Sequence, residues 1–413
     1  MRAVRAQAGE SSVSVRTILA DRQVGVVILL AFVLMIGTGI VLPILPLFAR
    51  SFGGGYDDAG ILIAAYSGAR LVADLLGGRL IDRVGERAAA VSGLALLALA
   101  CILTALASSF ALAAIFWSGA GVGSAIVFAA MYSLLLKRVP KSRMARTLSV
   151  FYGAFNVGVV AGGFLAGVIA HELGIASPLF FAAGVAVLSA LLYVRFVPAA
   201  VPRGPTRHES DALPGIRAIL KTPGFGMVLT AQFAYLWMIV SVFDTLLPLF
   251  ADSLGVSTIG IGAIFAVALA AELLVLYPAG HPADSRGRRY VLAPALLAFG
   301  VTTAAVGFSS SPVVLGLLMA LLGVASGFAG VPPGAMLADV IPSSSSGTGV
   351  GIFRFAGDLG FTLGPLVAGF AAAHLGFEAA FALTAVPAAV AFVAVARGHE
   401  TLPALLTASE ELA

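Results

Sequence analysis

Long apolar stretches alternate with short polar segments along the whole chain. A bilayer core about 30 Å thick is crossed by roughly 20 apolar residues in a helix that rises 1.5 Å per residue. Stretches of that length lie near residues 24–49, 59–80, 88–107, 111–136, 147–170, 177–197, 224–250, 258–280, 290–308, 312–338, 348–371 and 376–396. The pattern therefore predicts an all-α membrane protein with twelve transmembrane helices.

Composition agrees with this prediction. The chain of 413 residues is 60% hydrophobic and only 11% charged, whereas soluble domains carry about 25% charged residues. A chain so poor in charge cannot cover a folded surface in water, so lipid is the expected solvent. The first apolar stretch is followed by eleven more, which argues against a cleavable signal peptide.

The chain repeats itself at a spacing of 202 residues. The segment Pro46-Leu47-Phe48-Ala49 matches Pro248-Leu249-Phe250-Ala251 without a gap. Glycines, an aspartate and an arginine of later segments match in the same register: Gly78, Asp82, Gly85 and Arg87 match Gly280, Asp284, Gly287 and Arg289. The chain is thus one unit of six spans written twice.

Six spans separate equivalent points, so the two halves have the same orientation in the membrane. Parallel repeats of this kind are related by an axis along the membrane normal, with a substrate site between them. We expect two pseudo-symmetric six-helix bundles, residues 1–198 and 223–413, joined by a cytoplasmic linker at 199–222 that is rich in proline and charge.

The distribution of basic residues predicts the topology. With twelve spans, all of the 24 Lys and Arg except Arg50, Arg70 and Arg354 fall on the side of the chain termini. Cytoplasmic loops carry such an excess. We expect a multi-pass protein of the cell inner membrane with both termini cytoplasmic, and no nucleic-acid partner despite the net charge of +4.

Polar chemistry for other functions is sparse. Cys101 is the single cysteine, and the five histidines show no metal-ligand spacing. The chain has no zinc-protease, serine-hydrolase or nucleotide-loop motif. We therefore expect neither an enzyme nor a metal or organic cofactor.

Two loops carry a motif that identifies a family. The loop after the second span contains Gly78, Asp82, Arg83, Gly85 and Arg87, and the loop after the eighth contains Gly280, Asp284, Gly287 and Arg289. This pattern resembles the G-x3-D-R-x-G-x-R signature of the major facilitator superfamily; a basic loop with a chance aspartate is the alternative. The resemblance implies a gating role, in which Asp82 docks at the start of the eleventh span, near Ser343 to Ser346 and Thr348, in the outward-open state.

Small residues four apart mark two spans as close-packing helices. The residues are Gly158, Gly162 and Gly167 in the fifth span and Gly360, Gly364, Pro365 and Gly369 in the eleventh. The pattern resembles the G-x3-G-P-x2-G element of drug antiporters, and Gly37, Pro43 and Pro46 resemble an element of twelve-span drug exporters, although the two prolines also fit a simple kink. The arginine and glutamine that such proton antiporters carry in the fourth span are absent here, so a mechanism through that arginine is not carried over.

Charged residues inside spans are costly and mark pathways or partnered bridges. Arg70 and Asp74 lie four apart in the second span, and Arg354 and Asp358 lie four apart in the eleventh. In the fold that the resemblance implies, the second and eleventh spans pack against each other across the domain boundary. The depths of the four residues match crosswise, which then predicts the interdomain pairs Arg70–Asp358 and Asp74–Arg354. Bridges within each helix are the alternative.

Two further carboxylates are candidates for ion coupling. Glu272 occupies the repeat position of Arg70, and Asp244 lies in the outer half of the seventh span. Burial without a basic partner favours proton uptake by such groups. Structural hydrogen bonding is the alternative for both.

The resemblance implies a cavity lined by the first, fourth, seventh and tenth spans, and these spans are mostly apolar and aromatic here. The substrate-cavity candidates are Trp117, Tyr132, Gln232, Tyr235 and Trp237. Such a lining suits a lipophilic or amphipathic solute and disfavours a sugar, which needs more amide and charged groups.

Together these features predict a secondary transporter that works by alternating access, similar to the twelve-span drug:proton antiporters. Its expected partners are a small lipophilic substrate, protons and the lipid bilayer, with the proton gradient as energy source and a monomer as the functional unit. An uptake symporter, an exporter of a native metabolite or lipid, and a non-transporting membrane receptor or scaffold are the alternatives.

Overall fold

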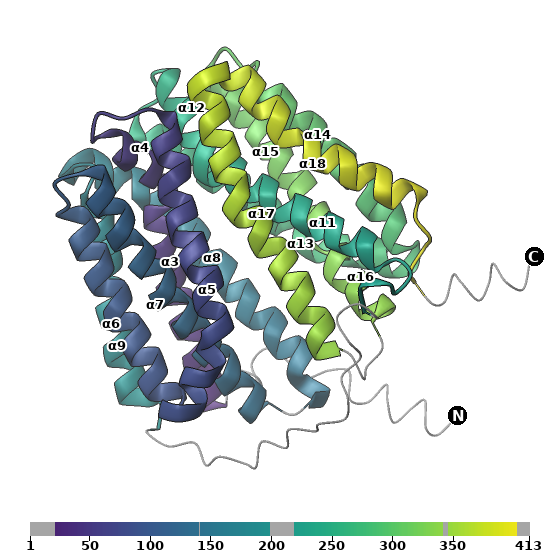
Figure 1. Ribbon diagram of the computed structural model, residues 1–413, viewed down its shortest axis with the longest axis horizontal. Helices are drawn as coiled ribbons and strands as arrows, with labels where there is room; N and C mark the ends of the chain where they lie inside the picture. Colours follow the sequence, from purple (N-terminus) through teal and green to yellow (C-terminus); the bar gives the residue numbers. More distant parts are fainter. Residues whose placement is uncertain (1–20, 140, 199–218, 342–345, 403–413) are drawn as a thin grey trace, which may run out of the picture.

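The computed structural model describes residues 21–139, 141–198, 219–341 and 346–402. Of the expected linker, residues 199–218 lie outside this part, so the domain boundaries remain a prediction. The described residues form helices joined by short turns, in two groups that Figure 1 shows side by side.

The first bundle contains the helices of the N-terminal half. They are α3 (Arg22–Val41), α4 (Leu45–Arg50), α5 (Tyr56–Val84), α6 (Glu86–Ala105), α7 (Phe110–Arg138), α8 (Lys141–Leu173) and α9 (Ser177–Phe196). Within it α3 packs on α8 and α9, and α7 packs on α5 and α6.

The second bundle repeats this arrangement. Its elements are α11 (Phe225–Ile239), the π-helix η1 (Val240–Leu246), α12 (Leu247–Ser253), α13 (Thr258–Ser285), α14 (Arg288–Val306), α15 (Pro312–Gly330), α16 (Pro332–Val340), α17 (Ser346–Leu375) and α18 (Phe377–Arg397). The bundles meet where α5 packs on α17 and α8 packs on α13.

The helices have the length and the surface of membrane spans. Eleven described segments are long and apolar enough to cross a bilayer, and α5, with 29 residues, completes the twelve. Large apolar side chains are exposed around the outside, such as Leu274, Val313 and Leu317, with 77%, 73% and 68% of their surface accessible. An exterior of this kind is stable in lipid.

Proline explains how the first span is divided. Pro43 lies in the turn between α3, which ends at Val41, and α4, and it has no N–H group to continue the ladder of α3, while Pro46 is the second residue of α4. Its repeat mate Pro248 is the second residue of α12. Before Pro248 the chain forms the π-helix η1 instead of a turn. The seventh span is therefore continuous, with a wider helical segment in its middle.

The two loops that carry the repeated Gly-Asp-Gly-Arg motif turn at glycines with positive φ. Gly85 has φ +81° directly before α6, and Gly287 has φ +114° directly before α14. Only glycine adopts this region without steric cost. We use these two turns to name the basic end of the molecule; the opposite end carries α4 and α12 (Figure 1).

Candidate functional site

A cavity of ≈ 380 Å³ lies between the two bundles. Its walls come from α3, α5, α7 and α8 on one side and from α11, η1, α13 and α17 on the other. Most of the lining is apolar, for example Met35, Ile63, Phe155, Phe243 and Phe361. Three charged side chains interrupt it, Arg70 from the first bundle and Asp244 and Glu272 from the second.

Glu272 is held by a tyrosine. The Tyr235 hydroxyl on α11 donates a hydrogen bond to the Glu272 carboxylate on α13, with an Oη–Oε1 distance of 3.0 Å. Both residues line the cavity. The contact fixes the carboxylate between two helices of one bundle, and Ser326 of α15 lies within hydrogen-bonding range of the same group.

Asp244 lies inside the π-helix η1 and is 7% exposed. Every residue of η1 is buried. Among the described residues its carboxylate has no hydrogen-bonding partner, although it lines the cavity. π-Helical turns inside α-helices are frequent at functional sites because they re-aim one side chain, and here that side chain is a buried acid.

The four interdomain charges gather around Phe128 of α7. The guanidinium carbon of Arg70 lies 5.9 Å from the centre of this ring, and that of Arg354 lies 5.7 Å from it. Arg70 also pairs with Asp74 within α5, at 3.8 Å between Nε and Oδ2. Asp358 is within electrostatic range of both arginines. The structure thus records the within-helix pair of α5, and the crosswise pairs Arg70–Asp358 and Asp74–Arg354 stay predictions.

Two of the five substrate-cavity candidates, Trp117 and Tyr235, line the cavity. Trp117 stacks on Tyr66 with 5.3 Å between ring centres. The other three are absent from the described lining. Tyr132 stacks on Phe128 instead, Gln232 packs against Gly357 of α17, and Trp237 is buried between α11 and α17 at Gly360. Helix rotation, which the sequence pattern does not resolve, separates these two groups.

Arg87 and Arg289, the last arginines of the two motif loops, occupy equivalent positions in the two bundles. Arg87 donates from Nη2 to the carbonyl of Val194 at the end of α9, at 2.7 Å. Arg289 donates to the carbonyls of Ala396 and Gly398 at the end of α18. Each arginine therefore satisfies the last carbonyls of a helix in its own bundle. The side chains of residues 75–83 and of Asp284, and the expected docking partners of Asp82, lie outside the described part.

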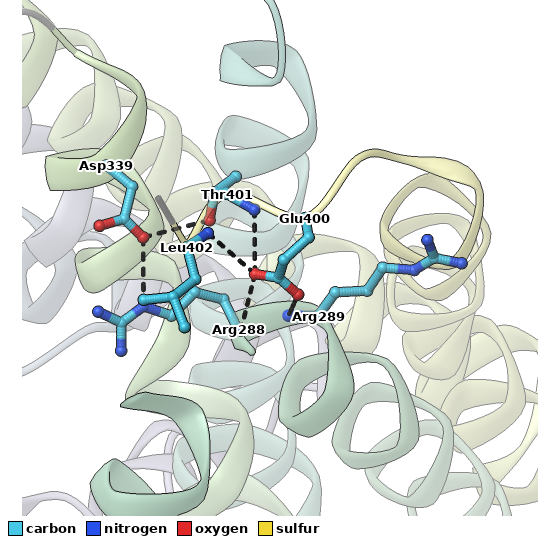
Figure 2. Close-up of polar contacts among 6 residues, drawn as sticks. All are labelled: Arg288, Arg289, Asp339, Glu400, Thr401 and Leu402. Atoms are coloured by element: carbon cyan, nitrogen blue, oxygen red, sulfur yellow. Dashed lines mark hydrogen bonds and ion pairs between the residues drawn. The ribbon is translucent and has the colours of Figure 1, made fainter. Parts of the chain in front are cut away.

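A short segment after α18 braces the basic end of the second bundle (Figure 2). The Glu400 carboxylate accepts hydrogen bonds from the backbone N–H groups of Arg288 and Arg289, at 2.9 and 3.1 Å, where α14 begins. Asp339 of α16 accepts from Arg288 Nε and from the Thr401 hydroxyl, each at 3.2 Å. The network joins α14, α16 and the chain after α18. Sequence reasoning did not identify Glu400 as part of it.

The opposite end is closed by a salt bridge between repeat mates. Arg50 at the end of α4 lies 2.9 Å from Asp252 in α12, measured from Nη1 to Oδ2, and the two residues are 202 positions apart. The Arg50 guanidinium also stacks over Tyr56, at 4.5 Å from the ring centre. Sequence reasoning singled out Arg50 but missed its partner.

The packing glycines divide into two groups. Gly158 and Gly162 of α8 lie against backbone carbonyls of α3, and Gly360 and Gly364 of α17 lie against carbonyls of α11, so these contacts are internal to each bundle. Farther toward the opposite end, the contacts cross between bundles. Those crossing residues are Gly167 against the carbonyl of Thr258, Gly369 against that of Tyr56, and Gly60 against that of Pro365.

Comparisons with known proteins agree with this architecture. The family model described as Major Facilitator Superfamily matches residues 27–271 and 238–411. An uncharacterized MFS-type transporter of Methanocaldococcus jannaschii is 22% identical over 375 residues, which cover 89% of this chain and 95% of that protein. The quinolone resistance protein NorA of Staphylococcus aureus is 24% identical over 174 residues, but these cover only 42% of this chain and 45% of NorA.

Solved structures share the fold. The nucleoside transporter NupG superposes with a TM-score of 0.76 at 14% identity, over 90% of this chain and 98% of NupG. A bacterial homolog of the human lysosomal transporter Spinster, in an inward-facing conformation, superposes with a TM-score of 0.74 at 14% identity, over 90% of this chain and 96% of that one. With two matched helical bundles, a cavity between them and a family model that covers nearly the whole chain, the protein belongs to the Major Facilitator Superfamily and is a multi-pass membrane transporter.

Proposed function

We propose that the protein is a proton-coupled exporter of lipophilic or amphipathic small molecules. The observation that carries this proposal is the pair of carboxylates, Asp244 and Glu272, in the wall of an otherwise largely apolar cavity. Acidic groups at membrane depth are costly, and they are retained where they carry ions or protons. The apolar remainder of the lining selects solutes by shape and apolar area.

In the proposed cycle each carboxylate alternates between two states. The ionised form attracts a solute that bears a cationic group, and the protonated form releases it. Tyr235 keeps Glu272 oriented toward the cavity, while Asp244 is free to exchange a proton with a solute or with water. The proton gradient supplies the energy, and the protein works as a monomer without a cofactor.

The proposed orientation places the basic end in the cytoplasm of the cell that makes the protein, because cytoplasmic loops carry the excess of Lys and Arg. The salt bridge Arg50–Asp252 then lies on the outer side. A transporter closed at its outer end exchanges solute with the inside, which is the state in which an exporter loads and an importer unloads. The partial similarity to the quinolone resistance protein NorA supports the export direction.

Inverted membrane vesicles test this proposal. The measured quantity is uptake of a fluorescent lipophilic cation with and without an imposed pH gradient. We expect gradient-driven uptake by the unmodified protein and at least a tenfold loss in Glu272→Gln and in Asp244→Asn, because the amides mimic the protonated carboxyl and cannot ionise. Downhill exchange of the probe should persist in both variants.

Glu378→Gln is the matched control, since Glu378 is an exposed carboxylate at the start of α18, away from the cavity. It should transport like the unmodified protein. Uptake by the unmodified protein that ignores the gradient would remove proton antiport. Intact gradient-driven uptake in both cavity variants would remove the assigned coupling residues.

A further inference from the structure

Equivalent positions in the two halves carry opposite charges across the cavity. Arg70 is the fourteenth residue after the start of α5 at Tyr56, and Glu272 is the fourteenth after the start of α13 at Thr258. The pseudo-two-fold axis therefore relates the two side chains and places them at the same depth. Both line the cavity. Exact symmetry would place the same residue at both positions. Instead the cavity has a basic wall at Arg70 and an acidic wall at Glu272 and Asp244.

The basic wall offers hydrogen-bond donors without partners. The Nε atom of Arg70 and the indole Nε1 atom of Trp117 are both buried and unpartnered among the described residues. Both residues adjoin Tyr66: Trp117 stacks on its ring, and Arg70, one helical turn later on α5, lies within hydrogen-bonding range of its hydroxyl. Buried donors without partners are uncommon in native proteins. An anionic or strongly accepting group on a solute would pair with the Arg70 guanidinium.

Asp74 is not a hydrogen-bond acceptor for Arg70 Nε. Its carboxylate lies 3.8 Å from Arg70 Nε, beyond hydrogen-bond length, and its Oδ2 atom is itself unpartnered. A guanidinium group has five N–H donors, so the ion pair leaves several available. Asp74 is also absent from the described lining of the cavity, whereas Arg70 is part of it.

The acidic wall offers the complementary acceptors. Glu272 accepts a hydrogen bond from Tyr235 and also lies within hydrogen-bonding range of the Ser326 hydroxyl, whereas Asp244 accepts none from the described residues. A protonated amine donates up to three hydrogen bonds and carries the charge that these groups attract. A cavity of ≈ 380 Å³ lies within the range of small-molecule sites.

We propose that the cavity binds a dipolar solute, an aromatic or otherwise apolar scaffold with an amine at one end and a carboxylate or similar acceptor at the other. The acceptor end contacts Arg70 and Trp117, and the amine contacts Glu272 and Asp244. This inference rests on the proposed function and narrows its substrate class from lipophilic cations to molecules that carry both groups.

Three probes built on one aromatic scaffold test the inference, one with the amine only, one with the carboxylate only and one with both. Binding to the purified protein in detergent is measured by quenching of tryptophan fluorescence, since Trp117 lines the cavity. We expect the dipolar probe to bind at least tenfold more tightly than either parent. Arg70→Gln should weaken the dipolar probe about tenfold, because a charge-assisted contact is lost, and leave the amine probe unchanged.

Two further variants make the test specific. Arg354→Gln is the control, because Arg354 lies at the same Phe128 ring but is absent from the described lining. It should not change the ranking of the probes. Arg70→Lys keeps the charge and should retain most of the preference. If Arg70→Gln does not fold, the ranking of the three probes on the unmodified protein decides.

Equal affinity for the dipolar and the amine probes in the unmodified protein would overturn the inference. An Arg70→Gln variant that weakens all three probes alike would also overturn it, since that result indicates a structural role. Binding is measured without a gradient, so a failure of proton coupling in vesicles leaves this test valid, and the two proposals fail separately.

Discussion

Gly60 lies at a contact between the two bundles where a single methyl group should bias the conformational equilibrium. A Cβ atom built on Gly60 would lie 2.2 Å from the carbonyl oxygen of Pro365 in α17. An ordinary contact is above about 3.4 Å, so Gly60→Ala requires α5 and α17 to separate there by roughly 1 Å. Overpacking of this kind costs about 1–3 kcal/mol.

This cost applies only to the state in which the opposite end is closed. The gain in helix propensity of alanine over glycine is common to both states and cancels. A penalty of about 1–3 kcal/mol shifts the ratio of the two states by roughly 5–150-fold toward the state open at this end. The change should be visible as a redistribution of distances between the bundles.

Spin labels at Ser108 and Ser310 provide the measurement. Both residues are exposed in loops at the opposite end, and they are 202 positions apart. Cys101 is the only native cysteine and is replaced by alanine in the background. Pulsed electron–electron distance measurements should show a larger long-distance population in Gly60→Ala than in its parent.

Gly68→Ala is the matched control, because it lies on the same helix and faces the same neighbour. A Cβ atom at Gly68 would lie 3.8 Å from Thr362 Cγ2, an ordinary contact. This variant should keep the parent distribution. Identical distance distributions for Gly60→Ala, Gly68→Ala and the parent would refute the reasoning that the glycine contact holds this end closed.

Two further predictions concern the ends of the molecule. Arg50→Gln should raise the population open at the opposite end by less than about tenfold. The side chains of Arg50 and Asp252 are 33% and 45% exposed, and such pairs contribute at most about 1 kcal/mol. The same spin labels measure this change, and exchanging the two charges should restore the parent distribution. Glu400→Ala should destabilise the first turn of α14 by roughly 1–2 kcal/mol, since the N–H groups of Arg288 and Arg289 lose their acceptor. Amide hydrogen exchange at that turn measures the loss, and unchanged protection would contradict the capping role.

The sequence predicts the twelve spans and the two-fold repeat well because both depend on long-range periodic signals. Hydrophobic length is set by the bilayer, and the 202-residue register brings many residues into alignment at once. The Arg50–Asp252 bridge could also have been predicted from the sequence, because the two residues directly follow the matching Pro-Leu-Phe-Ala segments.

Other features depend on rotations that composition does not encode. The π-helix at Val240–Leu246 replaces the turn of the first half, where Pro43 stands at the repeat position of Thr245. Its effect is to place Asp244 in the cavity wall, while Trp237, less than two turns earlier, packs inside the bundle. The hydrogen bond from Tyr235 to Glu272 similarly joins two candidates that sequence reasoning treated separately.

The glycine contacts between bundles come in a matched pair: Gly60 of α5 with Gly369 of α17, and Gly167 of α8 with Gly262 of α13. Two equal pivots on either side of a central axis resist a sideways hinge, since opening one alone would compress the other. Motion that keeps both pivots equivalent is a symmetric tilt of one rigid half against its counterpart. We therefore expect the chain repeat to determine the direction of movement as well as the shape.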